Sequence, residues 1–237
     1  MKADHYDNFA ARYDAENASS LFNAHYERPA MIELAGDVRG RRILDAGCGS
    51  GPLTAALRDR GAVMTGFDGS PAMVELARRR LGEDVPLHVA DLAQPLPFAD
   101  GAFDDVVASL VLHYLEDWTA PLRELRRVLA PGGRLIMSVN HPTVSVIIHL
   151  DEDYFATRQY SDEFVFDGSP GVLTMWHRPL HAMVDAFTAT GFAIEALSEP
   201  PPSPQTPPEL LTPRIASGER TAFLSFIFFV LRSTTDG

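Results

Sequence analysis

The chain has 237 residues, enough for one α/β domain with its own core and few for two full domains. Hydrophobic residues make up 46% of it and charged residues 22%, a balance that excludes wholesale disorder. The formal net charge of −12 disfavours a polyphosphate partner, so we expect no nucleic acid among its partners. The longest cationic cluster, Arg78-Arg79-Arg80, lies inside a predicted helix and is expected to form a solvated face.

The single cysteine, Cys48, excludes an intramolecular disulfide and a cysteine-rich zinc site, and we expect no metal. The first residues lack the apolar core of a signal peptide. The most apolar run, residues 222–231, is too short to span a bilayer as a helix and is interpreted as a buried strand. We therefore expect a cytoplasmic monomer or homodimer with no membrane partner.

Helical patterns fill residues 1–40, which we expect to pack against the opening of a sheet as a helical lid. From residue 41 onward, short β-rich runs alternate with helical patterns. This alternation predicts βαβ units and a parallel sheet with helices on both faces. The strands expected in residues 41–140, the predicted cofactor-binding core, are 43–45, 63–68, 87–90, 105–109 and 134–140.

A helix that carries Leu122, Leu125 and Leu129 is expected to stop at the run Ala130-Pro131-Gly132-Gly133. After residue 140 the pattern breaks into an excursion, 141–178, that is rich in aromatic and acidic residues and too long for a simple connection. We interpret it as a substrate-binding insertion of a single domain. The remaining part, 179–237, is predicted to hold a helix at 179–190, a strand at 192–197, a proline-rich loop at 200–213 and the final strand.

A glycine-rich turn follows the first predicted strand, in the run Leu44-Asp45-Ala46-Gly47-Cys48-Gly49-Ser50-Gly51, and opens directly onto a helix. Such a turn lets a ligand approach the backbone and the free N–H groups of the helix. Asp68 ends the next strand about 20 residues later, where an acid binds ribose hydroxyls in dinucleotide folds. An adenosine-containing ligand is therefore expected.

The details of this turn disfavour NAD. The nicotinamide fingerprint needs a small residue at position 52, where this chain has Pro52. Asp45 would repel a pyrophosphate, yet it suits a ligand that carries a free ammonium group, as the methionine part of S-adenosylmethionine does.

The run 44–51 resembles the first motif of class I S-adenosylmethionine-dependent methyltransferases. The runs Gly66-Phe67-Asp68-Gly69-Ser70-Pro71-Ala72-Met73 and Val89-Ala90-Asp91-Leu92 resemble the second and third motifs. Residues 96–98, 103–107 and 129–133 are similar to the later motifs of the small-molecule branch, so the resemblance covers about residues 6–140. It implies a Rossmann-like, seven-stranded, mostly parallel sheet with an antiparallel last strand, in three αβα layers.

The same resemblance assigns roles in binding S-adenosylmethionine. Asp45 would orient the methionine ammonium, Asp68 would hold both ribose hydroxyls, and Ser109 would lie near the sulfonium. The remaining predicted cofactor-binding residues line the methionine tail or the adenine, or fold over the cofactor from the lid: Tyr13, Gly47, Gly49, Gly69, Met73, Asp91 and Leu92.

Methyl transfer needs chiefly that the sulfonium be held in line with a nucleophile and that water be excluded, so a base is optional. If a base acts, His141, His177 and His113 are the catalytic candidates, because histidine accepts a proton near neutral pH. The density of aromatic residues suits an apolar or aromatic acceptor, although the same side chains could simply pack the excursion onto the sheet. The predicted substrate-binding residues are Tyr6, Tyr154, Tyr160 and Trp176.

We expect methyl transfer to a small-molecule acceptor, with oxygen or nitrogen favoured over carbon as the methylated atom, in the biosynthesis of a specialised metabolite. An RNA or protein methyltransferase is the first alternative. The acidic charge opposes it, and residues 109–112, Ser-Leu-Val-Leu, stand where such enzymes often carry an Asn/Asp-Pro-Pro-Tyr/Phe motif. A non-catalytic protein that only binds the cofactor remains the second alternative, because a fold and a site do not prove turnover.

Overall fold

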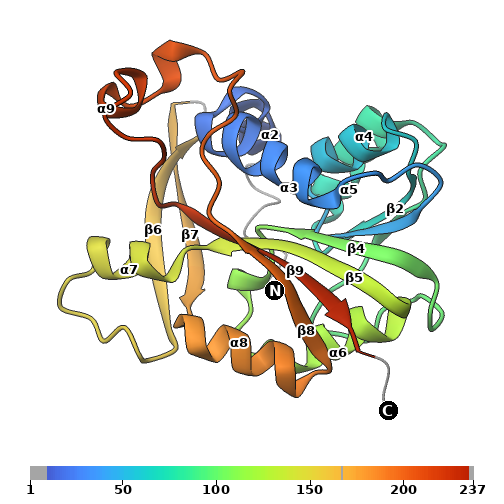
Figure 1. The fold of residues 1–237 in the computed structure, drawn as a ribbon. Coiled ribbons are helices and arrows are strands. Elements are labelled where there is room, and N and C mark those ends of the chain that lie inside the picture. The colour runs from blue at the N-terminus through green and yellow to red at the C-terminus, as the bar shows by residue number, and fades with distance from the viewer. Residues whose placement is uncertain (1–9, 167, 235–237) are drawn as a thin grey trace.

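The computed structural model describes residues 10–166 and 168–234, so the predicted substrate residue Tyr6 lies outside the described residues. Its central sheet has seven strands in the order β3-β2-β1-β4-β5-β9-β8 (Figure 1). Strand β9 pairs antiparallel with both β5 and β8, and the other pairs are parallel. The predicted mostly parallel sheet with an antiparallel last strand is confirmed. The strands are β1 (Arg42–Ala46), β2 (Val63–Asp68), β3 (Leu87–Val89), β4 (Phe103–Ser109), β5 (Leu129–Asn140), β8 (Phe192–Ser198) and β9 (Phe226–Ser233).

Helices cover both faces of this sheet and make three layers (Figure 1). Successive side chains of a strand point to opposite faces. Ile43 of β1 therefore packs with helices α3 (Arg28–Ala35), α4 (Pro52–Arg58) and α5 (Pro71–Leu81). Its neighbour Leu44 packs on the other face, with α6 (Thr119–Val128) and α8 (Leu180–Ala189).

Helix α6 stops one residue earlier than the sequence predicts. Leu129 has extended backbone angles and pairs with Phe103 of β4, so it begins β5 instead of ending the helix. The backbone of β5 thus pairs from Leu129 onward with the neighbouring strand β4, which satisfies its hydrogen-bonding groups. Helix signals in the local sequence carry no information about that pairing.

The excursion at 141–178 is an ordered unit beside the main sheet (Figure 1). It consists of α7 (Pro142–Ile148) and an antiparallel hairpin of β6 (Arg158–Phe166) and β7 (Ser169–His177), which forms a sheet of its own. Strand β6 contacts the N-terminal helix α2 (Ala10–Ser19). The hairpin and the predicted lid therefore meet on the same side of the molecule.

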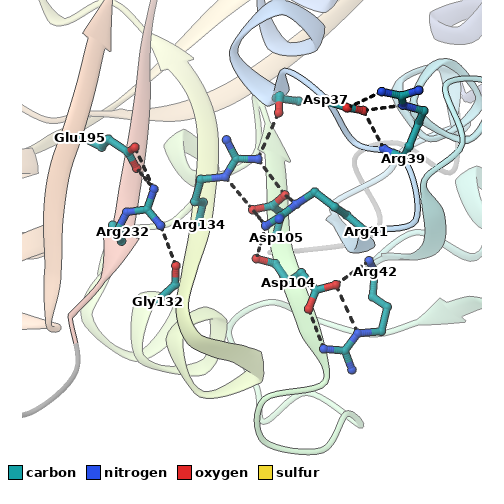
Figure 2. Close-up of polar contacts among 11 residues, drawn as sticks. Asp37, Arg39, Arg41, Arg42, Asp104, Asp105, Gly132, Arg134, Glu195 and Arg232 are labelled. Atoms are coloured by element: carbon teal, nitrogen blue, oxygen red, sulfur yellow. Dashed lines mark hydrogen bonds and ion pairs between the residues drawn. The ribbon is translucent and has the colours of Figure 1, made fainter.

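A buried ion-pair cluster lies at the amino ends of the strands (Figure 2). Asp105 of β4 is fully buried, and its carboxylate accepts hydrogen bonds from the guanidinium groups of Arg41 and Arg134. The neighbouring Asp104 makes a similar but more exposed pair with Arg42. This cluster joins β1, β4 and β5 at the end of the sheet opposite to their carboxyl ends.

The proline-rich segment between β8 and β9 contains two short helical elements. A 3-10 turn η3 (Pro208–Leu210) and the short helix α9 (Pro213–Ala216) interrupt the proline-rich segment before β9.

In the part of the chain that the structure describes, no helix is both long enough and apolar enough to cross a membrane. The same residues hold no cluster of three or more potential metal-ligating side chains.

Candidate functional site

A cavity of about 780 Å³, including its open mouth, lies at the carboxyl ends of the central strands, where open α/β sheets bind their ligands. Its walls come from the N-terminal helices, the turn after β1, the end of β2 and the turn after β4. The lining residues are Tyr13, Asn17, Asn23, Glu27, Arg28, Asp45, Gly47, Cys48, Gly49, Ser50, Pro52, Leu53, Asp68, Met73, Ser109, Leu110, Val111 and Tyr114.

The turn after β1 requires glycine for a steric reason. Gly47 has a φ of 75°, and a Cβ atom there would lie 2.6 Å from Cγ2 of Val111. A side chain at this position would thus push apart the turns that follow β1 and β4. Gly49 also has a positive φ, of 54°, and apart from its two chain neighbours no described residue has an atom within 4 Å of the place that a Cβ would take. The backbone of this turn is therefore open to a ligand, as predicted.

Asp68 connects the end of β2 to the glycine-rich turn. Its Oδ2 atom accepts a hydrogen bond from the N–H of Gly49 at 2.9 Å, and Oδ1 accepts one from the N–H of Ser70 at 2.8 Å. Ser70 in turn caps α5 by accepting a hydrogen bond from the N–H of Met73. Asp68, the residue predicted to bind the ribose, thus lines the cavity and also organises the backbone around it.

Asp45, in β1, has one carboxylate oxygen without a protein partner. Oδ2 accepts a hydrogen bond from the hydroxyl of Thr54 at 2.6 Å, whereas no hydrogen-bond partner for Oδ1 exists among the described residues. Burial raises the pKa of this carboxyl to about 7, and the negative charges of Glu27 and Asp68 add to the effect. A buried, unsatisfied oxygen on a cavity wall fits a ligand that brings a hydrogen-bond donor with a positive charge.

Glu27 is a cavity residue that sequence reasoning missed. It ends a π-helical turn, η1 (Asn23–Glu27), and one of its oxygens accepts hydrogen bonds from the hydroxyls of Ser109 at 2.7 Å and Ser138 at 2.6 Å. Burial raises the pKa of its carboxyl, against the lowering by the two hydroxyls and Arg28. Its only sequence signal is a Glu-Arg pair at the start of an apolar helix, which also fits an ordinary solvated turn.

Leu110 follows β4 in a strained conformation. Its φ of 51° is the only positive value among the described residues other than glycine, and its N–H donates to the side-chain oxygen of Ser138 at 3.0 Å. Such strain is typical of functional sites. It directs the turn after Ser109 along the cavity wall.

Helix α2, which is predicted to form a lid, is connected to the glycine-rich turn through Arg80 of α5. Asp14 accepts hydrogen bonds from the hydroxyl of Ser50 at 2.5 Å and from Nη2 of Arg80 at 2.8 Å. Nη1 of Arg80 also binds the backbone oxygen and the hydroxyl of Ser50. Arg78, Arg79 and Arg80 are all exposed, as predicted, and Arg80 in addition contacts Asp14 and Ser50 from two distant segments.

Comparison with known proteins identifies this core. Residues 44–137 match the family described as "Methyltransferase domain". A demethylmenaquinone methyltransferase of Thermus thermophilus is 41% identical over 134 residues, which cover 54% of this chain and 60% of the relative. Residues 44–137 therefore form a methyltransferase domain.

Further similarities extend the comparison. A demethylmenaquinone methyltransferase of Lactococcus lactis subsp. lactis is 33% identical over 158 residues, 63% of each chain. This chain thus spans roughly three fifths of the length of the first curated relatives it matches. An S-adenosylmethionine-dependent methyltransferase from Mesorhizobium loti has the same fold, with a TM-score of 0.65 and 24% identity over 86% of this chain and 96% of that one. The predicted fold is confirmed, and residues 44–137 match the family that the motifs indicate.

Three predicted cofactor residues of the methyltransferase domain do not line the cavity. Gly69 lies beside it, in the turn after Asp68. Oδ1 of Asp91 accepts a hydrogen bond from the N–H of Ala93, and Leu92 is buried in the core beneath β3. Their roles at the adenine stay predictions.

His141 has both ring nitrogens engaged outside the cavity. Nδ1 accepts a hydrogen bond from the N–H of Thr143 and so caps α7. The hydrogen of the neutral ring is therefore on Nε2, which donates to Oε1 of Glu199 at 2.7 Å. This geometry describes a helix cap and gives no support to a base in methyl transfer.

The other two candidate histidines are also buried away from the cavity. Nδ1 of His113 accepts a hydrogen bond from the N–H of Asn140, and burial lowers its pKa to about 3. Nε2 of His177 contacts the carbonyl oxygen of Tyr154 at 2.7 Å, and burial lowers its pKa as well. Neither belongs to the cavity wall of the methyltransferase domain.

Of the predicted aromatic substrate residues that the structure describes, two lie away from the cavity and one packs in a cluster that reaches it. The hydroxyl of Tyr154 accepts a hydrogen bond from the N–H of Leu180, and Trp176 lies opposite Gln159 in the hairpin; neither lines the cavity. Tyr160, whose hydroxyl accepts a hydrogen bond from Asn140, packs in a cluster that reaches the cavity. That cluster also contains Tyr13, Met73, Tyr114, Leu173 and Met175.

Proposed function

We propose that this chain transfers the methyl group of S-adenosylmethionine to a small-molecule acceptor. The observation that carries the proposal is the unpartnered, buried oxygen of Asp45 in the cavity of a methyltransferase domain. It suits the methionine ammonium, while Asp68 at the end of β2 suits the ribose hydroxyls. The open backbone at Gly49 leaves room for the methionine tail between them.

The cofactor, when bound, supplies an activated methyl group on its sulfonium. The residues of this chain then have to hold the sulfonium in line with the acceptor and to exclude water. The fastening of α2 to the glycine-rich turn by Arg80 and Asp14 serves the second task, because it keeps the lid over the cavity.

The acceptor site is proposed between α2 and the hairpin at 141–178. Three residues that line the cavity, Tyr13, Met73 and Tyr114, also pack in one cluster with Leu173 and Met175 of β7. This apolar wall supports an apolar or aromatic acceptor. The relatives are named as methyltransferases of demethylmenaquinone, and this name is consistent with an acceptor that carries a ring.

We further propose an oxygen or nitrogen atom as the methylated position and a specialised metabolite as the acceptor. Cytoplasmic location and a monomeric or homodimeric state also stay predictions. The three candidate bases, His113, His141 and His177, do not line the cavity, so proximity is proposed as the main catalytic effect.

An activity screen tests the function. The purified chain is incubated with S-adenosylmethionine and a panel of phenols, reduced naphthoquinones and amines, and products heavier by one methyl group are sought by mass spectrometry. We expect methylation of at least one ring compound, no competition by NAD, and no methylation of RNA or protein. Binding of the cofactor without turnover on any panel member would favour the non-catalytic alternative, and methylation of RNA or protein would contradict the proposal.

A pair of variants on one strand tests the location. Met175 of β7 belongs to the buried cluster, whereas Val172 of the same strand is 47% exposed. Met175→Ala should raise the KM for the acceptor about ten-fold, as expected for lost apolar contact, with cofactor affinity unchanged. Val172→Ala should leave both values at the wild-type level. Equal effects of the two variants on the acceptor would contradict the assignment.

A further inference from the structure

Two buried carboxyl groups face the same cavity. Asp45, in β1, and Glu27, at the end of η1, expose only 1% and 3% of their surfaces. Both line the cavity, and the charge of Glu27 raises the pKa of Asp45. Two carboxylates so placed repel each other and lose their hydration, which is costly unless a cation comes between them.

The described residues leave one buried oxygen of this carboxyl pair without a hydrogen-bond donor. Oδ1 of Asp45 has no hydrogen-bond partner among residues 10–166 and 168–234. The side-chain hydrogen bonds that the pair does accept come from hydroxyl groups. Thr54 donates to Asp45, and Ser109 and Ser138 donate to Glu27. Hydroxyls stabilise a carboxylate but carry no compensating charge.

Among the described residues, one cation faces the pair. Arg28, at the start of α3, partly compensates Glu27 by lowering its pKa, while its Nη2 donates to the backbone oxygen of Asn17. Asp68, from β2, adds a further negative charge near Asp45. The thiol of Cys48, on the same wall, is buried and its pKa is raised well above the usual range.

We propose that Glu27 and Asp45 together bind the α-ammonium group of the cofactor and that the pair loses a proton when the cofactor binds. This inference rests on the proposed use of S-adenosylmethionine. It adds Glu27, from the N-terminal segment, to the acid that the methyltransferase motif provides. The ammonium supplies donors for the unpartnered oxygen and a positive charge for both carboxylates.

The direction of the pH effect follows from the surroundings of the pair. Burial raises the pKa of both carboxyls, and that of Asp45 reaches about 7, so Asp45 of the free protein is partly protonated near neutral pH. A bound ammonium stabilises the ionised forms and lowers both values. Binding therefore releases protons, and affinity rises as the pH increases from about 6 to about 8.

Calorimetry on the full chain tests this inference without methyl transfer. The probe is S-adenosylhomocysteine, which carries the ammonium but no sulfonium. Binding enthalpies at pH 7 are measured in buffers of different ionisation enthalpy, which gives the number of protons released. We expect a net release of roughly half a proton or more per site, in keeping with a carboxyl of pKa about 7.

Glu27→Gln isolates the contribution of Glu27, because the amide oxygen can still accept from Ser109 and Ser138. The variant should bind S-adenosylhomocysteine about ten- to one-hundred-fold more weakly and release fewer protons. Binding of 5′-methylthioadenosine, which lacks the amino-acid part, should change less than about two-fold. Glu33→Gln, at an exposed position of α3, is the matched control and should bind both probes as the wild type does.

The outcomes separate the inference from the proposed function. Binding of S-adenosylhomocysteine to the wild type without proton release, or an equal loss of both probes in Glu27→Gln, would overturn the role of the pair and leave methyl transfer standing. Absence of S-adenosylhomocysteine binding by the wild type would overturn both. If Glu27→Gln fails to fold, an absence of proton release by the wild type would still overturn the inference.

Discussion

Oδ2 of Asp68 accepts a hydrogen bond from the N–H of Gly49 at 2.9 Å, and this contact joins the end of β2 to the turn after β1. The two residues belong to motifs that are predicted to bind different parts of the cofactor. Because one carboxylate shapes the glycine-rich turn and also faces the cavity, we expect ribose recognition and the geometry of the proposed methionine site to depend on the same side chain.

Asp68→Ala should weaken binding of S-adenosylhomocysteine by about 1.5–3 kcal/mol, the range for losing hydrogen bonds to a charged group. It should also lower the free energy of unfolding, because the N–H groups of Gly49 and Ser70 lose their acceptor. Calorimetry and urea unfolding measure the two effects. Asp84→Ala, at an exposed position, is the control. Unchanged affinity in Asp68→Ala would show that Asp68 is only a turn residue.

Arg80→Ala should loosen the lid helix α2, because it removes the contacts of Arg80 with Asp14 and Ser50. The ion pair is partly exposed, so we expect a modest loss of affinity, about 0.2–1 kcal/mol, seen mainly as faster release of S-adenosylhomocysteine in stopped-flow measurements. Arg79→Ala removes only an exposed pair with Glu75 and should leave the release rate unchanged. Equal release rates in all three proteins would contradict a lid held by Arg80.

Asp105→Ala should be strongly destabilising, since it leaves Arg41 and Arg134 without their buried partner (Figure 2). Breaking a buried ion pair typically costs about 3–5 kcal/mol of unfolding free energy. The adjacent variant Asp104→Ala breaks a more exposed pair and should cost about 1 kcal/mol or less. Urea unfolding of both variants measures the difference, and equal losses would argue against the buried network as a stabilising element.

His113 should make the protein less stable in mild acid. Burial lowers its pKa to about 3 in the folded state, whereas the unfolded chain takes up a proton below about pH 6.5. The contribution of His113 to the free energy of unfolding is therefore complete above that pH and falls as the pH decreases toward 3, by roughly 1 kcal/mol at the first unit below 6.5, whereas Asp45, with its raised pKa, acts in the opposite direction. His113→Asn should flatten this dependence in urea unfolding at pH 7 and pH 5.5. His181→Asn, at an exposed position, should keep the wild-type slope.

His141→Ala distinguishes a cap from a catalytic base. Loss of the cap on α7 should cost about 1 kcal/mol of stability, while kcat should stay within about three-fold of the wild type. A base would instead lose about 10²–10⁴-fold in kcat with cofactor affinity preserved. Steady-state kinetics with an acceptor from the screen, beside a thermal melt, separates the two roles.

The local elements of the methyltransferase domain were accessible to sequence reasoning because their signals are short in range. The glycine-rich turn, the cap at Ser70 before Pro71 and the acids at the ends of β1 and β2 all lie within a few residues of the structures they shape. Strand alternation predicted the layers of the sheet for the same reason.

By itself, then, the sequence determined the fold class, the methyltransferase motifs of residues 44–137 and the place of Asp45 and Asp68 on the cavity wall. Only the tertiary structure decided which further polar groups meet there. Glu27 meets Ser138 across 111 positions of the chain, and Arg80 meets Asp14 across 66, distances over which periodicity and capping signals carry no information. The packing of η1 and α2 over the carboxyl ends of the strands determines both contacts, because burial and charge act through space and not along the chain.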